Sequence, residues 1–140
     1  MPMNAPRNNS DLSNKLPRTM ILRGKNNFIR IFSEARPVYG KHIDMRYIFF
    51  DDPAEGFKVA FIAGKKTGKA ARRNHIKRLM REAYRLNRHT LENAVAEKGV
   101  GFHGALIARR SDTSYKAVEQ DIIKLLDRAA NDPSLAGAGR

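Results

Sequence analysis

The pattern of apolar and polar residues predicts six structural elements within residues 16–130. Residues 25–35, 70–88 and 114–130 place apolar side chains at helical spacing. Residues 43–50 alternate between two faces and contain β-branched and aromatic side chains, which favour a strand. Residues 57–63 and 102–108 are short apolar runs with the length of buried strands. The predicted order is therefore α-β-β-α-β-α, in a single α+β domain with helices packed on one sheet.

Turn-forming residues set the ends of these elements. Pro37 is expected to end the first helix, and one of residues 112–114 to cap the last. The turn-rich segment 51–56 joins the first two strands, so a hairpin between them is the simplest pairing. Residues 1–15, rich in Asn, Ser and Pro, and residues 131–140, with an Ala-Gly run, are expected to be disordered tails.

The predicted helix 70–88 has two faces of opposite chemistry. Its core-facing stripe is expected to consist of Ile76, Leu79, Met80, Ala83 and Leu86. The broadly opposite side carries Arg73, Lys77, Arg81, Arg85 and Arg88, with Arg78 at its border. Like charges four residues apart cost a helix ~0.2–0.5 kcal/mol each. This arrangement disfavours helix stability and suits the binding of phosphates.

The overall charge points to a polyanionic partner. The chain has 27 Lys and Arg against 14 Asp and Glu, a net charge of +13. Ten of the cations and a single acid, Glu82, lie between Gly64 and Arg88, so this window carries +9 of the total. Charge alone leaves open nucleic acid, an anionic membrane, an acidic protein or a merely solvated face. A membrane-surface helix would need large apolar residues at its polar boundary, and no dimerising heptad follows as in a zipper protein. We therefore expect RNA, with neither membrane nor DNA as partner.

The loop before this helix adds to the preference for phosphate. Lys65, Lys66 and Lys69 surround the helix N-terminus, where free N–H groups and the helix dipole favour anions. Arginine outnumbers lysine along the helix, and its planar guanidinium binds phosphate through two hydrogen bonds. A solvated face or a localisation signal remains the alternative.

Nothing in the sequence suggests that the protein itself is a catalyst. It has no cysteine, and its four histidines are scattered without metal-ligand spacing. The loop 64–69 is only faintly similar to a phosphate-binding P-loop. No apolar stretch is long enough to span a bilayer, and residues 1–10 lack the apolar core of a signal peptide, so a soluble cytoplasmic protein is expected. Phe28 and Phe32 lie one helical turn apart; they could stack on bases, although spacing alone favours the core.

Residues 65–84, KKTGKAARRNHIKRLMREAY, closely resemble the signature of the bacterial ribonuclease P protein subunit. The resemblance extends over about residues 16–130. It includes the pair Phe28 and Phe32, the strand end Ile107-Ala108-Arg109, and Ser114-Tyr115 at the start of the last helix. It implies a fold like domain 2 of ribosomal protein S5, with a left-handed β-α-β crossover.

The resemblance also implies a function. In this family a catalytic RNA cuts precursor tRNA to release its 5′ leader. The protein binds that RNA and the leader, raises substrate affinity and improves the use of Mg²⁺, which the RNA mainly holds. The alternatives are a ribosomal or general structural RNA-binding protein of the same fold, or a self-sufficient nuclease.

Site residues follow from the resemblance position by position. The residues that match the RNA-binding motif are Lys65, Lys66, Arg73, Asn74, Lys77, Arg78 and Arg81, and the charge pattern adds Lys69, Arg72 and Arg85. Phe28 and Phe32 match aromatic residues of the leader cleft, which reverses the preference for the core. Arg46 falls where a cleft residue, often aromatic, is expected. His75 stands where the family usually has a second arginine, so a weakened or pH-sensitive contact is expected there.

Overall fold

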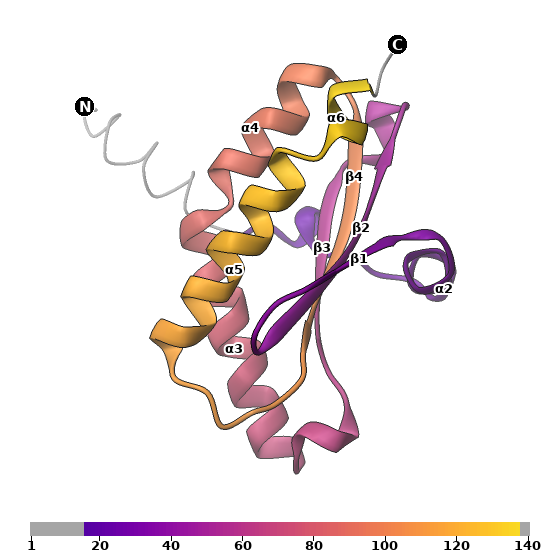
Figure 1. Cartoon of the computed structure of the whole chain (residues 1–140). Helices are drawn as coiled ribbons and strands as arrows, with labels where there is room; N and C mark the ends of the chain where they lie inside the picture. The colour runs from indigo at the N-terminus through magenta and orange to yellow at the C-terminus, as the bar shows by residue number, and fades with distance from the viewer. Residues whose placement is uncertain (1–15, 138–140) are drawn as a thin grey trace, which may run out of the picture.

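The alternation predicted for residues 43–50 is present in strand β2 (Ile43–Phe50), which buries Ile43, Met45 and Tyr47 on one face of a sheet. Arg46 and Ile48 lie on the opposite face, since successive side chains of a strand alternate. The computed structural model describes residues 16–137. In it the helices that follow β3 along the chain cover the first face of the sheet, and α2 (Lys25–Glu34) covers the second (Figure 1).

The six predicted elements are all present, and the α+β class is confirmed. In chain order the described elements are η1 (Arg18–Met20), α2 (Lys25–Glu34), β1 (Arg36–Tyr39), β2 (Ile43–Phe50), η2 (Pro53–Glu55), β3 (Phe57–Ala63), η3 (Lys65–Thr67), α3 (Ala70–Asn87), α4 (His89–Lys98), β4 (Gly101–Ala108), α5 (Tyr115–Ala130) and α6 (Pro133–Gly137). Ser114 caps α5 by accepting a hydrogen bond from the Ala117 N–H, as one of the three predicted capping residues. Strand β1 and helices α4 and α6 were not predicted.

The predicted hairpin between β2 and β3 is wrong. The strand order is β1-β2-β4-β3, so β4 lies between them, antiparallel to β2 and parallel to β3. Every residue of β4 except Ile107 is buried. A strand that is apolar on both faces is best placed in the middle of a sheet, and this outweighs the short connection between β2 and β3. The left-handed hand of the β3–α3–β4 crossover stays a prediction.

The unpredicted elements have weak local signals. Strand β1 contains Pro37, which lacks an N–H donor and is tolerated because β1 is an edge strand. Helix α4 buries only Leu91 and Val95, one turn apart, and ends at Gly99, whose φ of 65° is left-handed.

The expected C-terminal tail is partly ordered. Residues 131–137 contain α6, and Leu135 belongs to the main core. The Asp132 carboxylate accepts hydrogen bonds from the Ser134 backbone N–H and from the hydroxyl of buried Tyr47, which fixes this segment against β2. The predicted tails at residues 1–15 and 138–140 lie outside the described residues.

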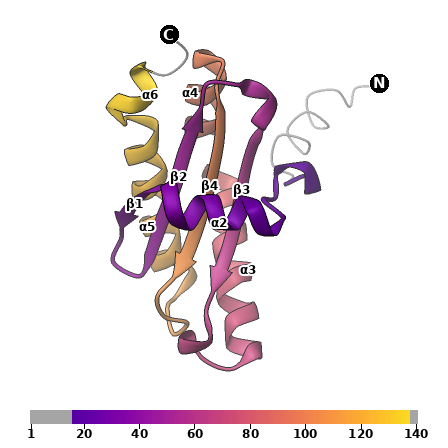
Figure 2. The same cartoon turned by 90° about the vertical axis from the view of Figure 1, so that its right-hand side faces the viewer.

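The sheet separates two cores of unequal size. The larger lies against α3, α4 and α5, and the smaller lies under α2, where Ile31 is fully buried with Leu22, Ala60 and Ala105. Helix α2 crosses the strands near their middle (Figure 2). Because one short helix does not cover the whole face, Ile62 and Ile107 remain partly exposed beyond it.

A buried carboxylate joins α5 to the turn between β1 and β2. The Asp121 Oδ2 atom accepts hydrogen bonds from the backbone N–H groups of His42, at 2.5 Å, and Ile43, at 3.0 Å. Hydrogen bonds to an ionised acceptor are roughly twice as strong as neutral ones. Asp121→Asn keeps an acceptor oxygen but loses the charge, so we expect the free energy of unfolding to fall by about 1–2 kcal/mol in urea denaturation. The control is Asp127→Asn, at an exposed position of the same helix, and an equal loss in both variants would contradict this role.

Candidate RNA interface

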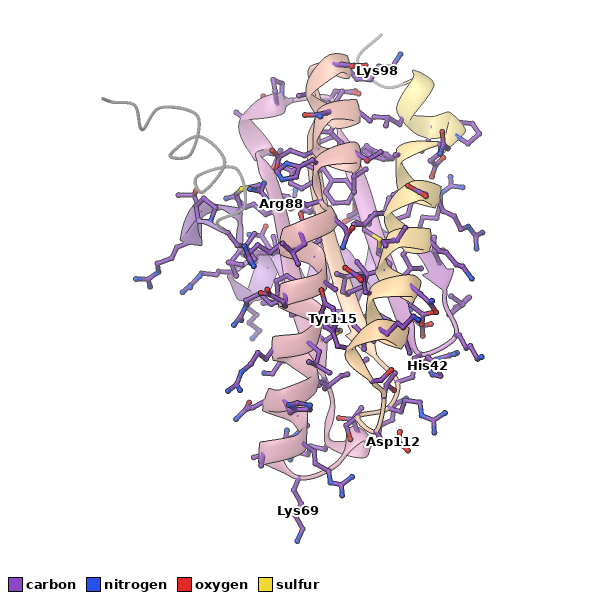
Figure 3. The ribbon with its side chains drawn as sticks, turned by 90° about the vertical axis from the view of Figure 1, so that its left-hand side faces the viewer. His42, Lys69, Arg88, Lys98, Asp112 and Tyr115 are labelled. Carbon is purple, nitrogen blue, oxygen red and sulfur yellow. The ribbon has the colours of Figure 1, made fainter. Side chains whose placement is uncertain are left out.

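The predicted RNA-binding residues lie in the loop before α3 and along α3 itself, most of them before the end of its first half, toward one end of the molecule. Lys69 is the N-cap of α3, and in Figure 3 it projects from the end of the helix layer farthest from Lys98. The exposed members of the predicted set are Lys65, Lys66, Lys69, Arg72, Asn74, Arg78 and Arg81. Arg73, Lys77 and Arg85 are half-buried. We call these ten residues the cationic face.

The core-facing side of α3 is rotated from its predicted position. Ile76, Met80 and Ala83 are fully buried as predicted, and Leu79 is half-buried. Leu86 is 42% exposed, whereas Tyr84 is fully buried with its ring 5.6 Å from that of Phe61. Helix α3 packs against both β3 and α5, so its buried stripe extends toward Tyr84 and leaves Leu86 outside.

Most of the cationic face is not neutralised by the protein. Among the ion pairs described within residues 16–137, the only one that involves this face joins Arg85 to Glu82, with an N–O distance of 2.6 Å. The hydrogen bond from Arg85 holds the pKa of Glu82 below its usual value, so this acid stays ionised at neutral pH. The face therefore has cationic donors available for an external anion.

Arg88 does not belong to this surface, which corrects the predicted row of cations. It is 3% exposed at the junction of α3 and α4 (Figure 3). Its guanidinium pairs with Glu92 and lies 3.6 Å from the Met20 sulfur. Arg88 thus stabilises the junction between the two helices and the segment before α2.

Parallel pairing of β3 and β4 adds two arginines that the sequence analysis missed. The carboxyl ends of parallel neighbours lie at the same edge of a sheet, so η3 after β3 lies beside the loop after β4. The Ser111 hydroxyl donates a hydrogen bond to the Thr67 carbonyl and joins the two loops. They enclose, with the first turn of α3, a pocket of about 530 Å³ lined by Lys66, Thr67, Arg72, Arg109, Arg110, Ser111 and Asp112.

This pocket is strongly basic. Four cations line it against one carboxylate, Asp112, which pairs with Arg110 at 2.8 Å. Arg109 is partly engaged, because it donates to the carbonyl oxygens of Gly40 and Lys41 and forms an ion pair with Asp44 at 3.6 Å. The strand end Ile107-Ala108-Arg109 is part of the family resemblance, but only the parallel pairing of β3 and β4 indicates that Arg109 adjoins the cationic face.

The predicted leader residues lie at the second face of the sheet: Phe28 and Phe32 belong to α2, and Arg46 belongs to β2. Phe28 is half-buried and packs against the smaller core, so it also has a structural role. Phe32 is 48% exposed. The Arg46 guanidinium lies 5.6 Å from the centre of the Phe32 ring, as a cation–π contact. An exposed ring beside a cation, at the part of the sheet face that α2 does not cover, is suited to stacking on an unpaired base.

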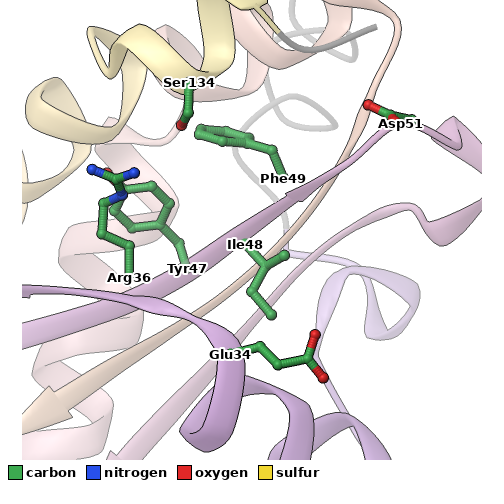
Figure 4. Close-up of a pocket in the computed structure, with 7 residues that line it drawn as sticks. All are labelled: Glu34, Arg36, Tyr47, Ile48, Phe49, Asp51 and Ser134. Atoms are coloured by element: carbon green, nitrogen blue, oxygen red, sulfur yellow. The ribbon is translucent and has the colours of Figure 1, made fainter.

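A larger cavity beside the C-terminal half of β2 has a charge that is unsuited to binding RNA. It has a volume of about 580 Å³ and is lined by Glu34, Asp51 and Arg36, among others (Figure 4). Its carboxylates outnumber its cations, which would repel phosphate. Within residues 16–137, no three His, Asp or Glu side chains gather so as to hold a metal ion. No helix in this range has the length and apolar character required to cross a membrane.

Comparison with known proteins agrees with this geometry. The family model described as ribonuclease P matches residues 16–130. The chain is 32% identical to the ribonuclease P protein component of Pelotomaculum thermopropionicum, over 78% of this chain and 91% of that protein. It is 39% identical to that of Chlorobaculum tepidum, over 69% of this chain and 66% of the relative.

Solved structures show the same fold. The RNase P protein of Staphylococcus aureus superposes with a TM-score of 0.63 at 20% identity, covering 79% of this chain and 94% of that one. The Thermotoga maritima RNase P protein gives a TM-score of 0.61 at 24% identity, over 77% and 96% of the two chains.

Proposed function

Because this chain belongs to the ribonuclease P protein family, we propose that it is the protein subunit of a bacterial ribonuclease P, which assists the maturation of tRNA 5′ ends. Its partners are the catalytic RNA and precursor tRNA, and it acts with them in the cytoplasm. The observation that carries the proposal is the combination of two surfaces on one small domain. An unneutralised cationic face meets phosphates, and the exposed Phe32 ring with Arg46 meets unpaired bases.

The protein contributes position and charge rather than chemistry. The catalytic RNA carries out cleavage, with Mg²⁺ bound mainly by RNA. The cationic face and the adjoining basic pocket neutralise phosphates, which lowers the repulsion between two RNA strands and the concentration of Mg²⁺ needed to bring them together. Holding the leader extended on the sheet face keeps the scissile bond in place.

A test is reconstitution with a bacterial ribonuclease P RNA at low Mg²⁺. We expect the full chain to lower the apparent Michaelis constant more for precursor tRNA with a leader than for a leaderless analogue. The chain without RNA is expected to leave the precursor uncut. An equal effect on both substrates would remove the leader from the proposal, and cleavage by the chain alone would make it a nuclease.

The competing function is structural RNA binding, as in a ribosomal protein of the same fold. A structural protein does not need an exposed phenylalanine beside a cation on an open sheet face. Co-purification distinguishes the two functions, because a ribosomal protein would follow ribosomes and a ribonuclease P subunit would follow its catalytic RNA.

A further inference from the structure

The edge of the sheet formed by β1 lies beside a second group of cations, which is separate from the cationic face. Lys41 lies in the turn between β1 and β2, and Lys124 and Arg128 lie one turn apart on α5. Together with Tyr39 these side chains line a pocket of about 210 Å³. We call Tyr39, Lys41, Lys124 and Arg128 the edge patch.

Two carboxylates near the edge patch, those of Asp121 and Asp132, are turned to other partners. Asp121 lies in the same pocket but is buried and accepts the two backbone hydrogen bonds of the β1–β2 turn. Asp132 is also buried and is hydrogen bonded to Tyr47. None of the ion pairs described within residues 16–137 involves Lys41, Lys124 or Arg128. The edge patch therefore presents three cations without protein counter-ions.

The turn that carries Tyr39 and Lys41 is held in a fixed position. Its Gly40 N–H donates to Asp44 at 3.2 Å, and Arg109 donates to the Gly40 carbonyl at 2.7 Å. The turn is so tight that a Cβ at position 40 would lie 2.2 Å from the Ile43 carbonyl oxygen. With Asp121 fixing the other side, little conformational entropy remains to be lost when a ligand binds here.

The edge patch is continuous with the proposed leader surface. In the β1–β2 ladder Pro37 pairs with Arg46 and Tyr39 pairs with Asp44. Directly paired residues project from the same face of a sheet, so Tyr39 lies on the face that carries Arg46 and is covered by α2. Tyr39 is 65% exposed, more than any other large hydrophobic side chain described. A strand of RNA that leaves Phe32 and Arg46 across the sheet edge meets the Tyr39 ring and then the cations of α5.

We propose that the edge patch binds the part of the 5′ leader that lies beyond the sheet face, with one base stacked on Tyr39 and phosphates on Lys41, Lys124 and Arg128. A ring flanked by cations suits single-stranded RNA of any sequence, since every base has a face to stack. The inference rests on the proposed function, because it assumes that a leader crosses the sheet.

The test uses the protein assembled with catalytic RNA and two precursors that differ only in leader length. The short leader ends on the sheet face and the long one continues past the edge. We expect Lys124→Gln with Arg128→Gln to weaken binding of the long-leader precursor by on the order of tenfold at low salt, and to reduce the slope of log affinity against log salt by about 1.4. Tyr39→Ala is expected to weaken binding of the same precursor by roughly 5- to 150-fold. Binding of the short-leader precursor stays unchanged in both variants.

A matched control removes two charges elsewhere. Lys98→Gln with Arg18→Gln neutralises two exposed cations outside the edge patch. Lys98 lies in the last turn of α4, as Arg128 lies in the last turn of α5. We expect this variant to leave the binding of both precursors unchanged. The inference is overturned if the edge variants weaken both precursors equally, because the patch then meets the catalytic RNA. It is also overturned if they weaken neither, as for a patch that binds an acidic protein.

Failure of the proposed function gives a different result. If the unaltered protein does not favour leader-bearing over leaderless precursors, the proposed function is wrong. If it does, but long and short leaders bind alike, only the edge patch proposal is wrong.

Discussion

Reversing two charges on the cationic face is expected to abolish most RNA binding while leaving the protein at least as stable. The change is Arg72→Glu with Lys77→Glu, at one exposed and one half-buried position of α3. Losing two phosphate contacts should weaken binding to the catalytic RNA by on the order of 100-fold at low salt and lower the salt slope by about 2. Filter binding over a series of salt concentrations measures both quantities.

The opposite effect on stability follows from local helix energetics. Position 72 lies in the first turn of α3, where a carboxylate favours the helix dipole by about 0.3–1 kcal/mol. A glutamate at 77 lies four residues from both Arg73 and Arg81 and replaces two repulsions with two attractions, each of roughly 0.2–0.5 kcal/mol. Thermal unfolding should therefore show an unchanged or higher midpoint, so lost binding cannot be attributed to unfolding.

A control variant reverses the same number of charges at a distance. Lys98→Glu with Arg18→Glu changes the net charge equally at exposed positions outside the cationic face. If affinity depended only on net charge, both double variants would bind equally weakly. An unchanged salt slope in Arg72→Glu with Lys77→Glu would mean that the phosphates lie on another face.

Local patterns were sufficient to predict the helices and strands whose apolar residues recur at a regular spacing. The alternation of residues 43–50 and the apolar stripes of α2, α3 and α5 each reflect burial against a single neighbour, so the sequence of one segment contains the signal. Helix α4 lacks such a stripe, and the edge strand β1 contains a proline, so both escaped prediction. Their formation depends on the sheet and on α5.

Strand order was beyond local patterns because it depends on competition between distant segments. Strand β4 displaces β3 from β2 since it has two apolar faces to bury. The same pairing decides the composition of the basic pocket. Arg109 and Arg110 are more than forty residues from Lys66 and become its neighbours only because β3 and β4 run in parallel.

The roles of individual charged and aromatic residues were predicted unevenly for a related reason. A helical projection gives the direction of a side chain, but it cannot reveal that α4 follows and covers Arg88. For Phe28 and Phe32, spacing alone favoured the core, and the family resemblance favoured the cleft. Phe28 packs on the smaller core and Phe32 is 48% exposed, and contact of either ring with the leader stays a prediction.

Replacing Phe32 with alanine is expected to weaken the recognition of the leader and leave the fold intact. The ring is 48% exposed, so its loss removes little buried apolar area. Stacking of an aromatic ring on an unpaired base contributes about 1–3 kcal/mol. We therefore expect the assembled enzyme to bind leader-bearing precursor roughly 5- to 150-fold more weakly, with leaderless precursor unaffected. Equilibrium binding of the two substrates under identical salt and Mg²⁺ measures the difference.

Ile29→Ala is the matched control for this variant. Ile29 lies on the same helix, is 54% exposed and is also a large apolar side chain, but it has no aromatic ring to stack on a base. If α2 acted only by covering the sheet, the two alanine variants would have the same small effect on both substrates. A selective loss in Phe32→Ala, absent from Ile29→Ala, requires the ring itself to contact the leader, because exposure, helix propensity and net charge are nearly the same in the two comparisons.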